Sequence, residues 1–549
     1  MSMPVGYRVE GAPGPGGIII GVASVTPRIS EQGGSFLSHT PAGIFTPESF
    51  DSDERLMIEM AEQFSSKEVI PVAERLEKQE PGLMPGLIRK AGELGFCGVD
   101  TPDAYGGLGL SKNLAARILE FLSLDAAFSV TVGITSGISQ FGLIGFGTES
   151  QRQKYLPRLA AGEWIGAYAL SEPNSGSDAL SMTTRAERRG DTYVLNGTKM
   201  WISNAQWSDL FLVMAKIDGE QVTAFLVEKD FPGVSIAREE HKMGLKGSST
   251  ARLVLENAVV PAENLLYEPG KGHYVAFNAL NIGRFKLASM SMGPARYAMR
   301  IASQYAGDRK QFNTSVREFG LMRQKFADMA AWYFAAEAMV YRTGANIDAA
   351  FSLSDGSVDG NRAAAEEFAV ECSVCKVFAT EMESRIVDEC LQAYGGYGFT
   401  EEFPIARVYR DARVSRIYEG TNEINRIFMA DRLVRRANEG KCTLTASGDS
   451  FFSELAGRAL AHYRKDQMVQ GATSDLLMLA YAEQSARLRA AQVGGIAEAC
   501  YARFVNLAAP MAAAAYQTVT GESVTLPAPR PVSVTDLSDA VYAKSGPAV

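Results

Sequence analysis

The sequence contains few of the residues that build disulfide scaffolds and metal centres. It has six cysteines in 549 residues, and its single C-x-x-C pair, Cys372 and Cys375, has no second pair and no nearby histidine. These numbers argue against a disulfide framework and structural zinc, so we expect no metal and a reducing compartment. Because the two cysteines lie one turn apart in a helical run, we interpret them as core packing. The four histidines are scattered, which weakens a histidine-built metal centre: His39, His241, His273 and His462.

Positive charge and long apolar runs are also scarce. The chain has 54 Lys and Arg against 63 Asp and Glu, a formal net charge of −9, which argues against a nucleic-acid partner. No apolar run is long enough to span a bilayer. The longest candidate near the N-terminus, residues 16–25, lacks the cationic lead-in of a secretory signal. We therefore expect a cytoplasmic protein of bacterial type, without signal peptide or transmembrane span.

Three common cofactor and nucleophile fingerprints are missing. The glycines at 14, 16 and 17 neither follow a strand nor open a helix, as a dinucleotide-binding motif would require. Gly270-Lys271 lacks the upstream glycine and the following Ser or Thr of a P-loop. The stretch 247–251, G-S-S-T-A, only approaches the nucleophile elbow G-x-S-x-G. A nicotinamide Rossmann domain, a P-loop NTPase and an α/β-hydrolase are all disfavoured.

The chain instead divides by its periodicity into five segments. Residues 1–48 are rich in Gly, Pro and Ser, which indicates an extended arm laid on a surface or a partner. Helical periodicity over 49–165, interrupted at 105–110, precedes a strand-like region at 166–270. Helical periodicity returns over 271–440, and an extension at 441–549 holds two or three helices, including 451–463 and 475–507, before a Pro-rich end. This order predicts an α+β protein that is mostly α.

Two stretches carry the chemistry. The first runs Y-A-L-S-E-P-N-S-G-S-D-A-L-S from Tyr168, followed by L-N-G-T-K-M-W-I-S-N-A from Leu195. Its small hydroxyl residues and glycine would let backbone N–H groups approach a polar ligand. Taken alone, however, this stretch indicates only the turn-rich start of a β domain. The second comprises residues 392–411, Q-A-Y-G-G-Y-G-F-T-E-E-F-P-I-A-R-V-Y-R-D, with I-Y-E-G-T-N-E-I from Ile417.

Together these stretches resemble the two signatures of the acyl-CoA dehydrogenase family. Y-G-G-L-G at Tyr105, M-G-L-K-G-S-S-T at Met243 and Y-E-G-T at Tyr418 extend the resemblance over roughly residues 50 to 440. The long C-terminal segment and G-R-F-K-L-A-S-M at Gly283 are most similar to the very-long-chain branch. The resemblance implies an N-terminal α domain, a middle β domain and a C-terminal four-helix domain, with FAD bound between the latter two.

The resemblance also implies the residues that hold the cofactor. On the chain's own side these would be Tyr168, Leu170, Ser171, Gly176, Ser177, Trp201, Ser203, Thr421 and Glu423. Ser203 stands where many relatives have Thr, and Glu423 where several have Gln. A neighbouring subunit would contribute a second set to the FAD pyrophosphate and adenosine, so a complete site would need a homodimer: Arg309, Gln311, Phe312, Gln392, Gly395 and Gly396.

The implied reaction is α,β-dehydrogenation of a fatty acyl-CoA thioester to a trans-2-enoyl-CoA. A base removes an α proton while the β hydrogen leaves as hydride to flavin N5. Glu419 is the candidate base, because the alternative position that some branches use is occupied by Gly283. Substrate contacts would come from the base's neighbours and from an arginine near the thioester, with small residues at the floor of the acyl tunnel that favour long or very long chains: Ser177, Tyr418, Gly420, Asn281, Arg284, Ser139 and Gly142.

The sequence leaves two other functions open, an oxidase and a scaffold factor. An acyl-CoA oxidase would pass electrons to O2, whereas a dehydrogenase would pass them to an electron-transfer flavoprotein. An assembly or scaffold factor could retain the fold. In the extension, Phe452, Leu455, Leu460 and Tyr463 fall on one helical stripe, which predicts either a peripheral contact with the inner membrane surface or an ordinary helix packed on the protein.

Overall fold

The computed structural model describes residues 31–549, and the part of the expected arm at 1–30 lies outside the described residues. Residues 31–50 are not laid on a surface. They contain two short 3-10 helices, Ser35–Leu37 and Pro47–Ser49, and bury Phe36 and Leu37. The backbone N–H of Gly34 donates to Glu371 at 2.6 Å. Isolated apolar anchors between glycines and prolines leave no periodic pattern, which is why the sequence suggested a loose arm.

The N-terminal domain is helical, as predicted, and its helices are shorter than the pattern suggests. Within the predicted helical region, residues 54–78 are interrupted by a π-helical turn at Ser65–Val69 and a 3-10 turn at Ile70–Val72, because Pro71 has no N–H to donate. The helices are α1 (Ser52–Phe64), α2 (Ala73–Glu77), α3 (Leu83–Glu93), α4 (Lys112–Leu122), α5 (Ala126–Gly133), α6 (Gln140–Phe146) and α7 (Glu149–Ala160).

One stretch of this domain is long and apolar enough to cross a membrane by length and composition. It spans Ala126–Phe146, and 83% of its apolar window is buried inside the protein. It consists of α5 and α6 joined by a π-helical segment, Ile134–Ser139. The burial is that of a core helix, and the segment lines the site described below.

The middle domain is a mixed sheet with strand order β6-β7-β3-β2-β4-β5-β8, and β1 pairs in parallel with β4. Strands β3 and β7 pair antiparallel with register shifts between Leu195 and Gly197 and between Lys199 and Ile202. The second shift takes residues 200–201 out of the ladder, next to the site. The strands are β1 (Gly166–Ala169), β2 (Arg185–Arg189), β3 (Thr192–Ser203), β4 (Leu210–Ile217), β5 (Gln221–Glu228), β6 (Val234–Ile236), β7 (Thr250–Pro261) and β8 (Leu265–Leu266).

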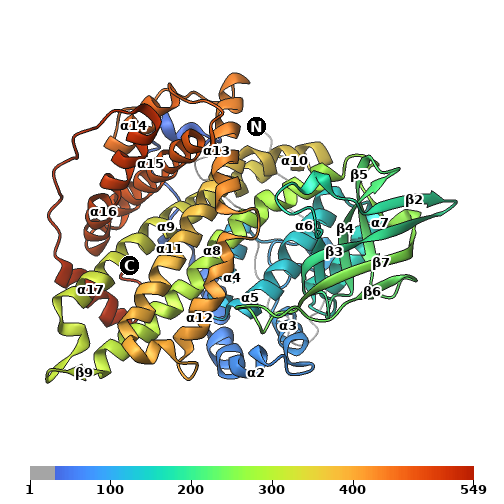
Figure 1. Ribbon diagram of the computed structural model, residues 1–549, viewed down its shortest axis with the longest axis horizontal. Helices are drawn as coiled ribbons and strands as arrows, with labels where there is room; N and C mark the ends of the chain where they lie inside the picture. Colours follow the sequence, from blue (N-terminus) through green and yellow to red (C-terminus); the bar gives the residue numbers. More distant parts are fainter. Residues whose placement is uncertain (1–30) are drawn as a thin grey trace, which may run out of the picture.

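The C-terminal domain is a bundle of long helices that lies between the sheet and the extension (Figure 1). Cys372 and Cys375 are fully buried in α11, which confirms that this pair packs the core. A two-stranded hairpin, β9 (Lys310–Gln311) and β10 (Thr314–Ser315), follows the first long helix. The helices are α8 (Gly272–Asp308), α9 (Gly320–Ser352), α10 (Val358–Glu367), α11 (Ala369–Tyr394), α12 (Pro404–Ala412) and α13 (Asn422–Asn438).

The extension folds as four helices at the end of the molecule opposite the sheet (Figure 1): α14 (Phe451–Leu460), α15 (Gln467–Val493), α16 (Ile496–Thr520) and α17 (Val534–Lys544). The single helix expected over 475–507 is wrong, because Gly494 and Gly495 adopt φ of +72° and +61° and separate two helices. The Pro-rich end also contains α17.

The membrane-facing stripe predicted in the extension is not on the surface. Phe452, Leu455 and Leu460 are buried, and α14 packs on α15 and α16. The Tyr463 hydroxyl donates a hydrogen bond to Asp431 of α13. The structure therefore supports the alternative of an ordinary helix packed on the protein, since an apolar stripe that is covered by protein has no area left to insert between lipids.

Candidate active site

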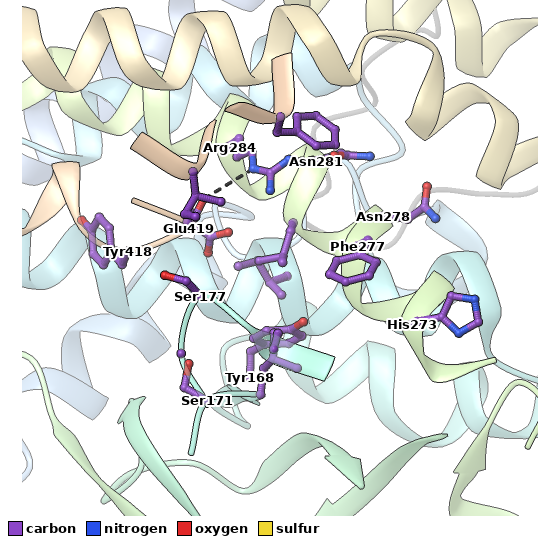
Figure 2. Close-up of a pocket in the computed structure, with 18 of the residues that line it drawn as sticks. Tyr168, Ser171, Ser177, His273, Phe277, Asn278, Asn281, Arg284, Tyr418 and Glu419 are labelled. Carbon is purple, nitrogen blue, oxygen red and sulfur yellow. Dashed lines mark hydrogen bonds between the residues drawn. The ribbon is translucent and has the colours of Figure 1, made fainter. Parts of the chain in front are cut away.

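A cavity of about 720 Å³ lies between the sheet and the C-terminal bundle and contains most of the predicted site residues. Figure 2 shows the labelled side chains of β1 and its following loop, Tyr168, Ser171 and Ser177, across the cavity from Arg284 and Glu419. Predicted residues in its lining are Tyr168, Leu170, Ser171, Gly176, Ser177, Trp201, Ser203, Asn281, Arg284, Tyr418, Glu419 and Gly420.

The loop after β1 is held by a buried carboxylate. Glu172 accepts hydrogen bonds from the backbone N–H of Thr183 at 2.6 Å and of Thr184 at 3.0 Å, and pairs with Lys199 Nζ at 2.8 Å. Burial alone would raise the pKa of Glu172, but the Lys199 ammonium and these donors lower it to about 2. The loop is fixed at this end, and Gly176 beyond it faces open space, with no heavy atom within 4 Å of where a Cβ would be.

Trp201 occupies the position where β3 leaves the ladder. Its φ of +61° lies in the left-handed region, which bulky residues rarely adopt, and its side chain is 57% exposed. Ser203, two residues on, returns to the ladder opposite Thr250. A strained backbone that presents an indole ring at a cavity mouth is typical of a functional position.

Glu419 lies in a strained loop just before α13. Its φ is +56° and that of Gly420 is +78°. A left-handed conformation at a non-glycine residue costs on the order of 1 kcal/mol and persists only where the surroundings impose it. Here Lys376 Nζ donates to the Gly420 carbonyl at 2.8 Å and to Asn422 Oδ1 at 2.7 Å, and Asn425 Nδ2 donates to the Gly420 carbonyl at 2.9 Å.

Glu419 lies in the wall of the main cavity. Its Oε2 atom is buried and has no hydrogen-bond partner among the described residues. Burial raises the pKa of Glu419 to about 7, while Arg284 and Lys376 act in the opposite direction. A Cβ on Gly283 would lie 3.0 Å from Oε2, so this glycine lets the backbone of α8 come close to the carboxyl group. A carboxyl group poised near neutral pH without a partner is suited to accept a proton.

Arg284 lies on the α8 wall of the cavity and is buried. Its Nη1 donates to Asn281 Oδ1 at 3.1 Å and its Nε to the backbone carbonyl of Glu419 at 3.4 Å. Its guanidinium also lies over the Phe428 ring, 4.9 Å from the centroid. These contacts place a fixed cation beside the base loop, where it can hold a polar group of a ligand.

A second, narrower cavity of about 50 Å³ shares Ile134, Ile138, Tyr418 and Glu419 with the first one. It continues from Glu419 into the protein, between α8 and the π-helical segment. Apolar and small residues make up nearly all of its remaining wall, with one exception, Lys286: Val130, Gly133, Gly137, Phe141, Ala279, Ile282, Gly283, Lys286, Leu287 and Met290.

Ser139 and Gly142, expected at the floor of the acyl tunnel, line neither cavity. Ser139 packs against β1, where a Cβ on Gly166 would lie 2.7 Å from its side chain. A Cβ on Gly142 would lie 2.8 Å from Leu212 of β4. Gly133 and Gly137, on the same stretch of helix, line the narrow cavity instead.

The residues expected from a neighbouring subunit form a separate hollow of about 550 Å³ on another part of the surface. Its lining includes Arg309, Gln311, Gln392, Gly395 and Gly396. Phe312 stands beside it, 90% exposed and with a φ of +52°.

Thr421 and Glu423 line neither this hollow nor the main cavity. Thr421 instead caps α13, its hydroxyl accepting from the Ile424 N–H at 3.2 Å. Glu423 is exposed in the first turn of the same helix.

Sequence reasoning missed Lys376 and the outer wall of the main cavity. Lys376 was detectable in principle as the lone cation in the run C-S-V-C-K-V-F-A, since a buried lysine needs partners. The outer-wall residues have no motif and come together only because α8, α10 and α13 converge: His273, Tyr274, Phe277, Asn278, Glu366, Ile424, Phe428, Arg432 and Arg435.

Comparison with known proteins decides the family. Models of the N-terminal, middle and C-terminal domains of acyl-CoA dehydrogenase match residues 51–163, 167–258 and 270–434. A probable acyl-CoA dehydrogenase of Bacillus subtilis is 44% identical over 433 residues, which cover 77% of this chain and 73% of that protein. The chain belongs to the acyl-CoA dehydrogenase family.

Two further relatives refine this assignment. The very long-chain specific acyl-CoA dehydrogenase of Macaca fascicularis mitochondria is 40% identical over 65% of this chain, a match that spans about half (53%) of that relative's length. The crystal structure of a Bacillus anthracis acyl-CoA dehydrogenase complexed with FAD superposes with a TM-score of 0.89 at 38% identity, over 95% of this chain and all of that one. The protein is a flavin-dependent oxidoreductase of acyl-CoA thioesters, with FAD as cofactor.

The residues of the main cavity fit this cofactor. A planar aromatic ring needs apolar faces and polar edges, and Leu170, Trp201 and Ser203 offer both. Gly176 leaves open space where a side chain would stand, which allows the backbone to approach a polar group of the ligand closely. In the separate hollow, Gly395 and Gly396 do the same. The unpartnered Oε2 of Glu419 faces the main cavity.

Replacing Lys376 by methionine is expected to move the acid limb of the kcat–pH profile to higher pH. The ammonium of Lys376 lowers the pKa of Glu419. On the hypothesis that Glu419 is the catalytic base, only its carboxylate is active, so activity is expected to rise with pH through about 7. Loss of the charge raises that pKa by up to about one pH unit. Lys376→Arg, which keeps the charge, should leave the acid limb of the kcat–pH profile at its wild-type pH. A purely structural role would instead lower kcat equally at all pH values.

Proposed function

We propose that the protein catalyses the α,β-dehydrogenation of long-chain or very-long-chain fatty acyl-CoA thioesters to trans-2-enoyl-CoA. The observation that carries the proposal is the position of Glu419 at the junction of two cavities, a wide one that opens outward and a narrow apolar one that continues inward. A thioester at the junction would present its α carbon to the carboxylate, with the hydrocarbon chain in the narrow cavity.

In this proposal Glu419 is the base that removes the α proton and holds it on its carboxyl group, which the raised pKa permits. Its own backbone N–H donates no hydrogen bond within the described residues and is free to stabilise the charge that develops on the thioester oxygen. Arg284 orients the thioester end through its fixed guanidinium, and Tyr418 and Gly420 shape the walls around the reacting carbons. FAD, when bound, supplies the acceptor for the β hydrogen.

We assign the cofactor to two surfaces. Tyr168, Leu170, Ser171, Gly176, Ser177, Trp201 and Ser203 would hold the flavin end within the main cavity. The hollow around Arg309 and Gln392 would serve the FAD of a second subunit, so that the working unit is a homodimer. The support is the cluster of exposed aromatic side chains beside it, Phe312 at 90%, Phe399 at 89% and Tyr397 at 47%, because such patches are normally covered in an assembly.

The domain limits and the electron acceptor are also proposals. We propose domain limits at 49–165, 166–270, 271–440 and 441–549, and an electron-transfer flavoprotein as electron acceptor. An oxidase differs in how fast the reduced flavin reacts with O2, and a scaffold factor would not reduce its flavin at all. The intact set of Glu419, Arg284 and cavity residues favours an active enzyme over a scaffold.

Anaerobic titration of the full-length FAD-loaded protein with a panel of acyl-CoAs tests this function. We expect palmitoyl-CoA and longer chains to bleach the flavin absorbance much faster than butyryl-CoA, because each methylene buried in the apolar cavity adds binding free energy. Admitting air afterwards separates an oxidase from a dehydrogenase by the rate at which the colour returns. A flavin that no acyl-CoA bleaches would overturn the proposed function.

A further inference from the structure

The narrow cavity follows one face of α8 and ends at a lysine. Ala279, Ile282, Gly283, Lys286 and Met290 recur at the spacing of one helical turn along its wall. Beyond Lys286 lies another small cavity, lined by apolar side chains of α4 and its neighbours together with Asp100 and Ser136. Lys286 is the one residue that lines both cavities. Its side chain therefore separates the two.

The two ends of the Lys286 side chain have different surroundings. Its Cδ lies 3.4 Å from where a Cβ on Gly137 would stand, so the methylene stem faces the narrow cavity. Its Nζ donates to Asp100 Oδ1 at 3.0 Å and to the Ser136 carbonyl at 3.3 Å, and neither of these residues lines the narrow cavity. The end of the narrow cavity is thus closed by hydrocarbon rather than by a charge.

The Lys286 ammonium is fixed by a buried ion pair. Asp100 accepts from Lys286 on one oxygen and from Lys112 Nζ, at 3.3 Å, on the other. All three side chains are almost completely buried. Removing one partner from such a group leaves an uncompensated charge, so the pairing holds the stem in a single place.

We propose that the stem of Lys286 is the end wall of the acyl site and sets the longest chain the enzyme accepts. This inference rests on the proposed function, in which the narrow cavity holds the acyl chain. The terminal methyl of the longest good substrate meets the Lys286 methylenes. The cavity lined by Phe96, Ala115, Ile118 and Leu119 is a reserve of apolar space that the wall closes off.

Three variants of the full-length FAD-loaded enzyme separate the stem from the charge. Lys286→Ala removes both, Lys286→Met keeps most of the stem and removes the charge, and Lys286→Gln shortens the stem and keeps a donor toward Asp100. With Lys286→Ala, kcat/KM for chains two carbons longer than the wild-type optimum should rise about fifteenfold relative to the optimum, from roughly fourfold for each newly buried methylene. Lys286→Met should retain the wild-type profile.

A variant that fills the cavity behind Lys286 gives a second, independent measurement. Ala115→Leu, placed in the Lys286→Ala background, fills that cavity and should cancel the gain for longer chains. If Lys286→Ala does not retain flavin, Lys286→Gln must still move the optimum toward longer chains.

An unchanged profile in flavin-loaded Lys286→Ala or Lys286→Gln would overturn the proposal, and so would equal shifts in the alanine and methionine variants. If the wild-type flavin is not bleached by any acyl-CoA, it is the proposed function that fails. If acyl-CoA bleaches the wild-type flavin but the chain-length profiles of the variants are unchanged, only the inference about Lys286 is overturned.

Discussion

Glu419→Gln is expected to lower dehydrogenation of the best acyl-CoA by about a thousandfold or more while the protein stays yellow. The amide has the shape of the carboxyl group but cannot accept the α proton, and general-base catalysis contributes roughly 10² to 10⁴ in rate. The loss should appear in kcat of single-turnover flavin reduction, because the cavity that binds the substrate is unchanged. Flavin absorbance before substrate addition measures cofactor retention.

The matched control for this variant is Glu402→Gln, which changes an exposed carboxyl group in the same domain. It should reduce its flavin at the wild-type rate. Glu419→Gln with full flavin content and near-wild-type reduction would remove Glu419 from the mechanism and leave the buried, unpartnered oxygen without an explanation.

Gly137→Leu is expected to cut kcat/KM for the longest chains by about sixtyfold and to leave butyryl-CoA within a few-fold of the wild type. Gly137 lines the narrow cavity, and a Cβ there would already touch Lys286, so a leucine fills the deep end. Loss of about three buried methylenes, at roughly 0.8 kcal/mol each, gives this magnitude. A chain-length profile of flavin reduction measures it.

Gly145→Ala is the control for adding a side chain to a glycine of the adjoining helix, since nothing lies within 4 Å of its Cβ position and it lines neither cavity. Its profile should match the wild type. The outcome that contradicts the prediction is an unaltered profile in flavin-loaded Gly137→Leu. Ser139→Leu and Gly142→Leu are expected to disturb packing on the sheet instead of chain length.

The site could be located from the sequence to the extent that local stretches carry it. Residues 168–177 and 417–424 are each continuous, so the family resemblance can be recognised in them, and Tyr168, Gly176, Ser177 and Glu419 do line one cavity. The helix–sheet–helix order was also predictable, because the period of apolar residues changes at the boundaries. The burial of Cys372 and Cys375 was predictable, because their spacing places both side chains on one face of a helix.

Chain periodicity alone could not show which face of a helix is covered or how a regular helix is interrupted. The stripe at Phe452 and Leu455 has the same spacing whether lipid or protein covers it. In the structure these side chains are buried, and α14 packs on α15 and α16. Nor could periodicity show the π-helical turn at Ile134–Ser139, beside which Gly133 and Gly137 line the narrow cavity while Ser139 and Gly142 pack toward the sheet.

By itself, the sequence determined the order of the domains, the candidate base and the loops that carry the cofactor residues, since each depends on residues that are near one another along the chain. Only the tertiary structure decided the environment of that base. Lys376 lies 43 positions before Glu419 and Lys286 lies 186 positions after Asp100. Their roles arise because packing removes water around buried charges, and such charges then hold whatever partner the fold brings to them.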